Sequence, residues 1–480
     1  MPEFLVHFFH AIDKVAIYTP YAALLLLVAA IIVACKNGFK NKPLAPYVEG
    51  KGPGKWAWIC VAVLWVVVML NYADRQLLST LNKSITDPNL PGSIEMTQAE
   101  FGLITSIFLV IYACLSPIGG FLADRFSRKT IIMCSLVVWS LATWFTGMAD
   151  SFNTLLAARA AMGISEAFYI PAALALISDY HRGGTRSMAT GLHMSGIYAG
   201  QAIAGYGAMV SGDPTNLGWH ATFEVFGAIG VIYGLIVIIF LRDPEAATPE
   251  QMAAAKTADP ANAPASTNFT VGEALDNLFS TKAMWLLIGV VSLSGFANWF
   301  IMNWYPRLLQ DTYGMTEAAA GPAATGPVNI VKYFAVLIAA AIADRWSRSN
   351  PNARAIVPAA AFLISGPCII IAMLPSLGID FLVFSASVAI GLVAMQGLAQ
   401  GALDANLMPV LRSQIDERFS ATGYGMLNLT SVGAGALVSY MGGVLLDMNV
   451  PLSAVMVVSG AFIFIAAFFL IAMRAKKASA

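Results

Sequence analysis

The sequence predicts an all-α membrane protein made of two bundles of six transmembrane helices each, preceded by one extra N-terminal transmembrane helix. Three observations predict this fold class. Of the 480 residues, 58% are hydrophobic and only 11% are charged, whereas a soluble domain carries about 25% charged residues. Apolar stretches of the roughly 20 residues that a helix needs to cross a bilayer recur along the whole chain. An internal repeat then divides these stretches into two sets.

The apolar stretches number thirteen and are joined mostly by short connections. Glycine and proline occur inside them, as in GPAATGPV at 321–328. Membrane helices tolerate both residues because neighbouring helices and water satisfy the freed backbone groups. The approximate limits of the stretches are 15–35, 56–80, 99–122, 130–149, 154–178, 187–211, 219–241, 283–309, 317–343, 354–374, 379–403, 421–442 and 452–473.

The placement of basic residues predicts the orientation of these spans. If the ADRFSRK loop at 123–129 lies in the cytoplasm and the spans alternate, 21 of the 27 Lys and Arg residues lie inside and three lie outside. The remaining three fall within helices. This asymmetry predicts a multi-pass protein of the bacterial inner membrane, with its N-terminus outside and its C-terminus in the cytoplasm.

The first apolar stretch has a second interpretation, because IVAC at 32–35 resembles a lipoprotein cleavage box. Cleavage at this point would place the five lysines between 36 and 55 outside the membrane and would invert every later loop. We therefore expect a retained extra helix followed by a cytoplasmic linker, together spanning residues 1–55.

Charge and cysteine usage exclude several classes of protein. The 27 basic and 27 acidic residues balance, and no run of like charges points to a nucleic-acid partner. The five cysteines lack the CxxC or CxxH spacing of a metal site or disulfide framework. There is no G-x-S-x-G, H-E-x-x-H or phosphate-loop motif. We therefore expect no metal, no cofactor and no enzymatic activity.

The internal repeat is a matched pair of polar loops. GGFLADRFSRK occupies 119–129, and AAAIADRWSR occupies 339–348, with the shared motif 220 positions later. Each copy follows the second helix of a six-helix set. The longest polar stretch, 242–282, lies between the sets, and its Ala, Pro, Glu and Thr content is typical of a linker that need not pack. These boundaries predict bundles at 56–241 and 283–480.

With these features, the chain after residue 55 resembles the major facilitator superfamily of transporters. The resemblance implies that the polar loop is a cytoplasmic latch, whose acid pairs with basic groups and a neighbouring helix end and so stabilises the outward-facing state. The G-x-x-x-D-R-x-x-R-K loop of that family is matched by Gly120, Asp124, Arg125, Arg128 and Lys129. The second copy of the loop supplies Asp344, Arg345 and Arg348.

Three further elements resemble the anion:cation symporters, which carry organic acids and acid sugars. They are NYADR at 71–75, ARAAMGISEAFYIPAAL at 158–174, and Trp304 with Pro306. The spinster transporters, which move lysolipids and sphingoid lipids, share N-Y-x-D-R and the Glu of the second element. The resemblance implies alternating-access transport, either of a small organic anion such as a sugar acid or hexuronate, or of a lipid. The extra first helix and Lys332 match neither pattern.

Four ionisable residues lie within two of the predicted spans: Asp74, Arg75, Arg159 and Glu166. A charge at the bilayer centre costs about 2.5–3.5 kcal/mol on insertion scales, so such residues indicate a functional site. Arg159 and Glu166 are two helical turns apart and share a face, whereas Asp74 and Arg75 point about 100° apart. We expect Asp74 near Arg159, and Arg75 nearer a central cavity or Glu166. A purely structural ion network is the alternative.

The same residues predict coupling to protons, with sodium as the other possible ion. A substrate carboxylate arriving at Arg159 or Arg75 would compete with Asp74 or Glu166 for the same cation, so protonation of the acid and binding of the anion would favour each other. His193 is a candidate proton relay, and a histidine bonded at a helix end is the alternative.

Lys332 is predicted to lie near mid-membrane, either as an anion ligand or as a residue that snorkels to the interface. Polar side chains on the same set of helices suit a hydroxyl-rich substrate, or else bond neighbouring helices. We expect a monomer whose partners are a small anionic substrate and the lipid bilayer. The further candidate substrate contacts are Asn298, Asn303, Tyr305, Tyr333, Gln396, Gln400 and Asn428.

Overall fold

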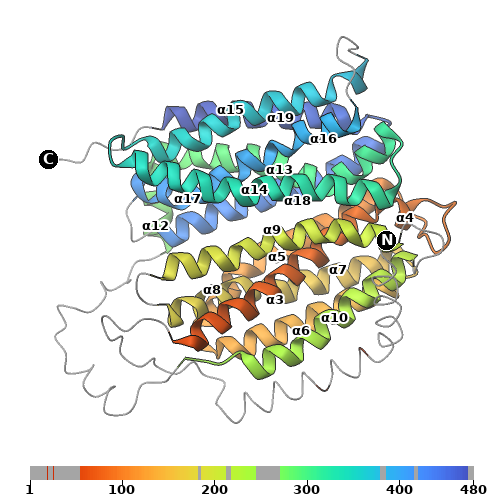
Figure 1. The fold of residues 1–480 in the computed structure, drawn as a ribbon, viewed down its shortest axis with the longest axis horizontal. Helices are drawn as coiled ribbons and strands as arrows, with labels where there is room; N and C mark the ends of the chain where they lie inside the picture. The colour runs from red at the N-terminus through yellow and green to blue at the C-terminus, as the bar shows by residue number, and fades with distance from the viewer. Residues whose placement is uncertain are drawn as a thin grey trace. The chain divides into compact units, whose positions relative to one another are not determined.

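The computed structural model describes residues 54–181, 185–211, 218–244, 271–378, 385–415 and 420–473, and the single positions 19 and 25. The regular elements of these segments are helices (Figure 1), which confirms the all-α prediction. The predicted extra helix at 15–35, apart from those two single positions, and most of the linker at 242–282 lie outside the described residues.

The described helices follow the order of the predicted spans. The earlier ones are α3 (Lys55–Thr80), α4 (Asn82–Thr86), α5 (Gln98–Arg125), α6 (Arg128–Gly147), α7 (Phe152–Glu166), α8 (Tyr169–Tyr180), α9 (Arg186–Ser211) and α10 (Gly218–Phe240). The later ones are α12 (Val271–Ser280), α13 (Lys282–Tyr313), α14 (Glu317–Ser347), α15 (Ala353–Met373), η2 (Pro375–Leu377), α16 (Ala386–Ala394), α17 (Gln396–Gln414), α18 (Ser420–Asp447) and α19 (Leu452–Ala472).

Eleven stretches of the described chain are helical, long enough and apolar enough to cross a membrane. They account for all but two of the thirteen predicted spans. The span at 15–35 lies outside the described residues, and the span at 187–211 forms α9, whose polar and glycine residues make it less apolar. The described part of the predicted span at 379–403 forms two helices, α16 and α17, with an interruption at Met395, and α17 continues to Gln414.

The predicted span at 154–178 is interrupted between α7 and α8, and Pro171 explains the interruption. A proline has no N–H and its ring clashes with the carbonyl four residues earlier, which here belongs to Ala167. A Cβ on Gly119 of α5 would lie 2.6 Å from this carbonyl oxygen, so only glycine lets α5 approach it. Glu166 is therefore the last residue of a half-helix.

The two interrupted spans share a hydroxyl contact at the break. Ser135 of α6 donates to the carbonyl of Ser165 at the end of α7. Ser365 of α15 donates to the carbonyl of Met395, between α16 and α17, at 2.5 Å. In both pairs the two residues are 30 positions apart. The internal repeat therefore extends from the polar loops to the breaks in the helices.

The chain divides into two compact units. The first comprises Met1–Asp74, Ile111–Gly200 and Trp219–Asn268, and the second comprises Arg75–Val110, Gln201–Gly218 and Phe269–Ala480. Helices α3, α5 and α9 therefore contribute residues to both units. The predicted bundles at 56–241 and 283–480 stay a prediction.

Each unit is built by helices that pack side by side. In the first, α6 packs on α7 and α8 (Figure 1). Val137 of α6 also contacts Val231 of α10. In the second, α13 packs on α18 and α19, α14 packs on α17, and α15 packs on α17 and α19 (Figure 1). These contacts position the polar residues described below.

Within the second unit, acidic side chains of the later helices hold α4 and the start of α5. Glu317, in the first turn of α14, accepts hydrogen bonds from the backbone N–H of Ser84 at 3.1 Å and from the Ser84 hydroxyl. Asp447, at the end of α18, accepts from the backbone N–H groups of Gln98 and Ala99 at 3.0 and 2.7 Å. A carboxylate thus caps the positive N-terminal end of α5.

Candidate functional site

Asp74 and Arg159 come together in the first unit. Asp74 of α3 is 2% exposed, and the Thr143 hydroxyl of α6 donates to its Oδ2 at 3.1 Å. Arg159 of α7 is buried too, and its Nη1 lies 3.5 Å from the carbonyl oxygen of Asp74. The structure therefore places Asp74 beside Arg159, the arrangement that we expected from the sequence.

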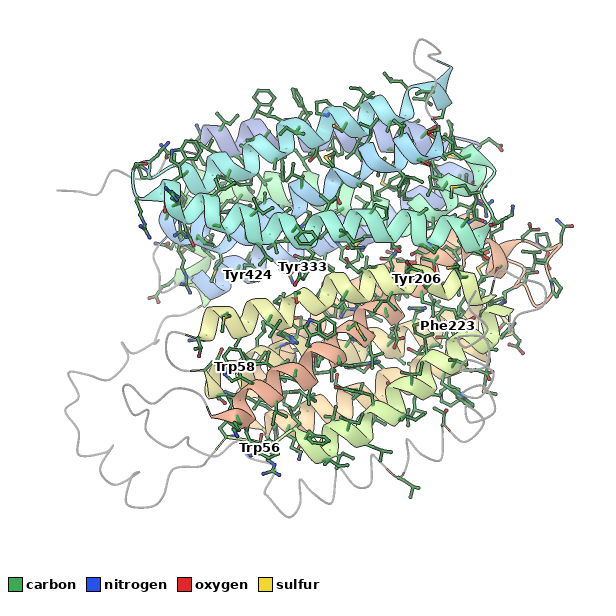
Figure 2. The ribbon with its side chains drawn as sticks, viewed as in Figure 1. Trp56, Trp58, Tyr206, Phe223, Tyr333 and Tyr424 are labelled. Atoms are coloured by element: carbon green, nitrogen blue, oxygen red, sulfur yellow. The ribbon has the colours of Figure 1, made fainter. Side chains whose placement is uncertain are left out.

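Glu166 completes a cluster of two acids and one base, the Asp74 cluster. Its side chain is fully buried, and the positive charge of Arg159 interacts with both Glu166 and Asp74. The guanidinium also lies 5.5 Å from the ring centroid of Phe223 (Figure 2) and 3.3 Å from the Met162 sulfur. Asp74 Oδ1 and Arg159 Nε have no hydrogen-bond partner among the described residues, so the cluster keeps unused hydrogen-bonding capacity.

The charge balance of the Asp74 cluster indicates what it can do. With both acids ionised the cluster carries one net negative charge, and burying an uncompensated charge is expensive. One bound proton leaves one acid neutral, and the positive charge of Arg159 then balances the negative charge of the other acid. The cluster is therefore suited to taking up and releasing a single proton. Substrate contact by Arg159 stays a prediction, because its side chain is buried in this structure.

Arg75 points away from its neighbour Asp74. Its guanidinium carbon lies 5.1 Å from the ring centroid of Phe108 in α5, within the range of a cation–π contact. Asp74 instead contacts Thr143, so the adjacent side chains diverge as helical geometry predicts. The contact with Phe108 was not foreseen from the sequence, and substrate binding by Arg75 stays a prediction.

His193 lies in a tightly packed part of the first unit. It is fully buried on α9, and its ring lies 6.1 Å from that of Tyr169, edge to face. The backbone carbonyl of Leu64 interacts with His193 and also accepts the Tyr169 hydroxyl at 2.9 Å. This environment suits a histidine that packs three helices together, and a role in proton relay stays a prediction.

Lys332 meets two amide side chains in the second unit. It is 2% exposed on α14, and its Nζ donates to Asn298 Oδ1 of α13 at 3.2 Å. Gln396 of α17 donates to the same oxygen at 3.1 Å. Three helices therefore converge on one acceptor. This burial argues against the snorkelling interpretation, in which the ammonium would reach water.

Two glycines bring α17 against the turn of α14 that carries Lys332. A Cβ on Gly397 would lie 2.3 Å from the Val328 carbonyl oxygen and 2.8 Å from the backbone nitrogen of Lys332. A Cβ on Gly401 would lie 2.7 Å from the Lys332 carbonyl oxygen. Because the two glycines are four residues apart, they form one stripe of the helix. Small residues of this kind allow close approach of membrane helices, and here they set the position of Gln396.

An acidic residue also interacts with Lys332. Asp404 of α17 interacts electrostatically with Lys332 and accepts a hydrogen bond from Gln400 at 2.8 Å. Helix α17 continues for ten residues beyond Asp404, so this acid lies within the helix and not at its end.

The other candidate substrate contacts are of two kinds. Asn303 donates to the Ser439 hydroxyl at 2.6 Å, and Tyr305 is fully buried, so both pack between helices. Tyr333, shown on α14 in Figure 2, and Asn428 of α18 are half-buried. Tyr333 and Asn428 are thus more accessible than Asn303 and Tyr305. Substrate contact stays a prediction for all four residues.

The polar loop after α5 is bound to the ends of two helices. Arg128 forms an ion pair with Asp179, near the end of α8, and its Nη1 donates to the Ala175 carbonyl at 3.2 Å. Lys129 Nζ donates to the Ile238 carbonyl, near the end of α10, at 3.1 Å. A cation at a helix C-terminus interacts favourably with the helix dipole, so this loop has the helix-end contacts that a latch requires.

The two copies of the loop differ in their surroundings. The pair of Asp344 and Arg354 in the second copy joins Oδ1 and Nη2 at 2.9 Å and is exposed, unlike the largely covered pair of Arg128 and Asp179. A Cβ on Gly120 would meet open space, and the side chains of Asp124 and Arg125 lie outside the described residues. The latch role stays a prediction for the whole set: Gly120, Asp124, Arg125, Arg128, Lys129, Asp344, Arg345 and Arg348.

Sequence reasoning missed Gln76, which follows the NYADR motif directly. Pro306 lacks the N–H that would bond the carbonyl of Met302, four residues earlier in α13. Gln76 Nε2 donates to this freed oxygen at 2.5 Å and to the Ser79 hydroxyl at 2.7 Å. Pro306 signals a freed carbonyl in the sequence, but nothing there indicates that Gln76 is its partner.

Buried clusters of ionisable residues inside membrane-spanning helices are typical of secondary transporters. Comparison with known proteins gives the family. The chain belongs to the Major Facilitator Superfamily, whose family model matches residues 64–395. It is therefore a multi-pass membrane transporter, as the sequence predicts.

Similar proteins include sugar-acid and spinster transporters. The D-galactonate transporter of Escherichia coli O6:H1 is 26% identical over 312 residues, which cover 63% of this chain and 70% of that one. Protein spinster homolog 3 of Danio rerio is 27% identical over 336 residues, covering 66% and 63%. The probable galactarate/D-glucarate transporter of Bacillus subtilis is 27% identical over 288 residues, covering 56% and 61%. Two of the three matches thus span less than two thirds of the relative.

A solved structure shares the fold. It is a bacterial homologue of the human lysosomal transporter spinster, in an inward-facing and unoccupied conformation, with a TM-score of 0.70 and 20% identity, covering 87% of this chain and 97% of that one. At this identity the similarity supports the fold and leaves the substrate open.

Proposed function

We propose that this transporter carries a small organic anion of the sugar-acid class, by proton-coupled symport in the bacterial inner membrane. Lys332 carries the proposal, because a buried ammonium surrounded by the amides of Asn298 and Gln396 offers a charge for a carboxylate and polar partners for hydroxyl groups. The relatives named for D-galactonate and for galactarate/D-glucarate support the same class. A monomer with an outside N-terminus and a cytoplasmic C-terminus completes the proposal.

Coupling to protons follows from the charges of the Asp74 cluster. An anion that enters alone adds a negative charge to the interior of the loaded carrier, and burying that charge is expensive. A proton held by Asp74 or Glu166 compensates for it, because the two acids share the single cation of Arg159. Loading both ligands together therefore favours the change between outward-facing and inward-facing states.

Uptake by proteoliposomes tests this proposal. Labelled D-galactonate should accumulate against its gradient when the outside is more acidic than the inside, and a protonophore should abolish the accumulation. A sodium gradient at equal pH should not replace the proton gradient. Accumulation driven by sodium alone would overturn proton coupling, and the absence of both uptake and binding of sugar acids would overturn the substrate class.

A lipid carrier is the second candidate, because the spinster proteins are comparably similar in sequence. The polar surroundings of Lys332 favour the sugar-acid proposal. Competition separates the two candidates. Unlabelled galactarate should displace labelled D-galactonate, and a lysophospholipid below its micelle concentration should not; the reverse result would favour the lipid carrier.

A further inference from the structure

A small cavity in the second unit lies beside Lys332 and has room for about one water molecule. Helices α3, α13 and α14 form its wall. The polar part of this wall consists of Gln76, Thr325, Asn329 and Lys332, and Pro306 and Met302 also line it. Gln76 and the two α14 residues Thr325 and Asn329 were absent from the candidates that the sequence suggested.

Asn329 has an unused hydrogen-bonding atom in this wall. Its side chain is 5% exposed, its Nδ2 donates to the Thr325 carbonyl at 2.9 Å, and its Oδ1 has no partner among the described residues. The neighbouring groups are engaged: the Thr325 hydroxyl donates to the Gly321 carbonyl at 3.1 Å, and Gln76 Nε2 donates to Met302 and a serine hydroxyl. A buried acceptor without a donor is unfavourable, so a ligand that donates to Asn329 Oδ1 gains affinity.

Lys332 supplies the complementary group on the same face of α14. It is three residues after Asn329, so the two side chains are neighbours on the helix surface, and both line the cavity. The Lys332 ammonium donates to Asn298 and also interacts with Asp404. Because both side chains line the cavity, a group that occupies it meets a cation, Lys332, and an acceptor, Asn329 Oδ1.

A hydroxyl group suits this combination, since it both donates and accepts and is about the size of a water molecule. The cavity is too small for a sugar ring or an acyl chain. When a substrate carboxylate pairs with Lys332, the carbon that bears the carboxylate is the nearest one able to carry this hydroxyl. The matching ligand is thus an acid with a hydroxyl on carbon 2.

We propose that this cavity is a hydroxyl subsite, in which Asn329 Oδ1 accepts a hydrogen bond from the 2-hydroxyl of a carboxylic acid held at Lys332. Asn329 is then a specificity-determining residue that selects 2-hydroxy acids over 2-deoxy acids. This inference rests on the proposed sugar-acid function and specifies which part of the substrate is recognised.

Binding of D-galactonate and its 2-deoxy analogue to the full chain in nanodiscs tests the subsite. A site that bonds a substrate hydroxyl discriminates strongly against the analogue that lacks it, and we expect wild-type protein to bind D-galactonate about tenfold more tightly or better. Asn329→Leu should lose about tenfold in affinity for D-galactonate and change by less than about twofold for the analogue. Equal losses for the two acids, or an unchanged preference, would overturn the inference.

Two further variants keep the test decisive. Thr325→Val is the matched control, because the Thr325 hydroxyl lines the same cavity but already donates to a backbone carbonyl; its preference between the two acids should equal that of wild type. Asn329→Ala removes the same acceptor if Asn329→Leu fails to fold. Wild-type protein that binds both acids equally overturns this inference alone, whereas wild-type protein that binds neither overturns the proposed function as well.

Discussion

Replacing Gly397 by alanine tests the close packing that builds the Lys332 site. The added Cβ would lie 2.3 Å from the Val328 carbonyl oxygen, whereas ordinary contacts begin at 3.4 Å, so α17 must withdraw from α14 by about 1 Å. Overpacking of this kind costs about 1–3 kcal/mol. The better helix propensity of alanine offsets about 1 kcal/mol of this cost. We therefore expect the free energy of unfolding to fall by up to about 2 kcal/mol.

The same displacement has a consequence for ligand binding. Gln396 is the residue before Gly397, and its hydrogen bond to Asn298 is 3.1 Å long. If the withdrawal of α17 lengthens this hydrogen bond by about 1 Å, the two side chains lie beyond hydrogen-bonding distance. Lys332 then loses one of the groups that organise its surroundings, so the affinity for D-galactonate should fall together with stability.

Thermal denaturation of the purified variant, with and without D-galactonate, measures both effects. Gly391→Ala is the matched control, because this glycine lies in the adjacent α16 and a Cβ there would meet open space. The control should unfold at the wild-type temperature or slightly above it. If Gly397→Ala also matches wild type in melting temperature and in stabilisation by D-galactonate, α14 and α17 do not pack as closely as the structure indicates, and the reasoning is refuted.

Three further substitutions test separate parts of the structure. Glu166→Gln removes one of the two acids that share Arg159, so pH-driven accumulation of D-galactonate should cease while exchange of substrate remains; uphill uptake would exclude Glu166 from the proton path. Lys332→Ala should weaken binding of D-galactonate by about tenfold or more and leave the neutral analogue galactitol unaffected, and equal losses would assign a structural role. Glu317→Ala removes the side chain that bonds α4, so hydrogen exchange at 82–86 should accelerate relative to the exposed control Glu95→Ala; unchanged exchange would show that this contact does not hold α4.

Patterns that belong to one helix could be predicted from the sequence. The apolar stretches marked eleven helices that the structure describes as long and apolar enough to span a membrane. The 100° step between neighbouring residues predicted that Asp74 and Arg75 diverge, as their contacts with Thr143 and Phe108 show. Proline positions marked carbonyls without a helical partner. These features depend on local geometry, which the sequence of one segment determines.

Contacts between helices required the tertiary structure. The sequence contains Gln76 and Pro306, but only the packing of α3 on α13 brings the amide to the freed carbonyl of Met302. The glycine stripe of α17 was visible, but its position against Lys332 was not. The electrostatic interaction of Asp404 with Lys332 likewise depends on the packing of α17 on α14.

By itself, the sequence determined that this protein crosses the membrane many times, which residues are ionisable inside the spans, and which of them share a helix face. The tertiary structure alone decided that Gln76 bonds the Met302 carbonyl, that Lys332 shares Asn298 with Gln396, and that Asn329 borders a small cavity. The physical reason is that periodicity orients a side chain about its own helix axis, whereas the identity of its partner depends on which distant helix packs against that face.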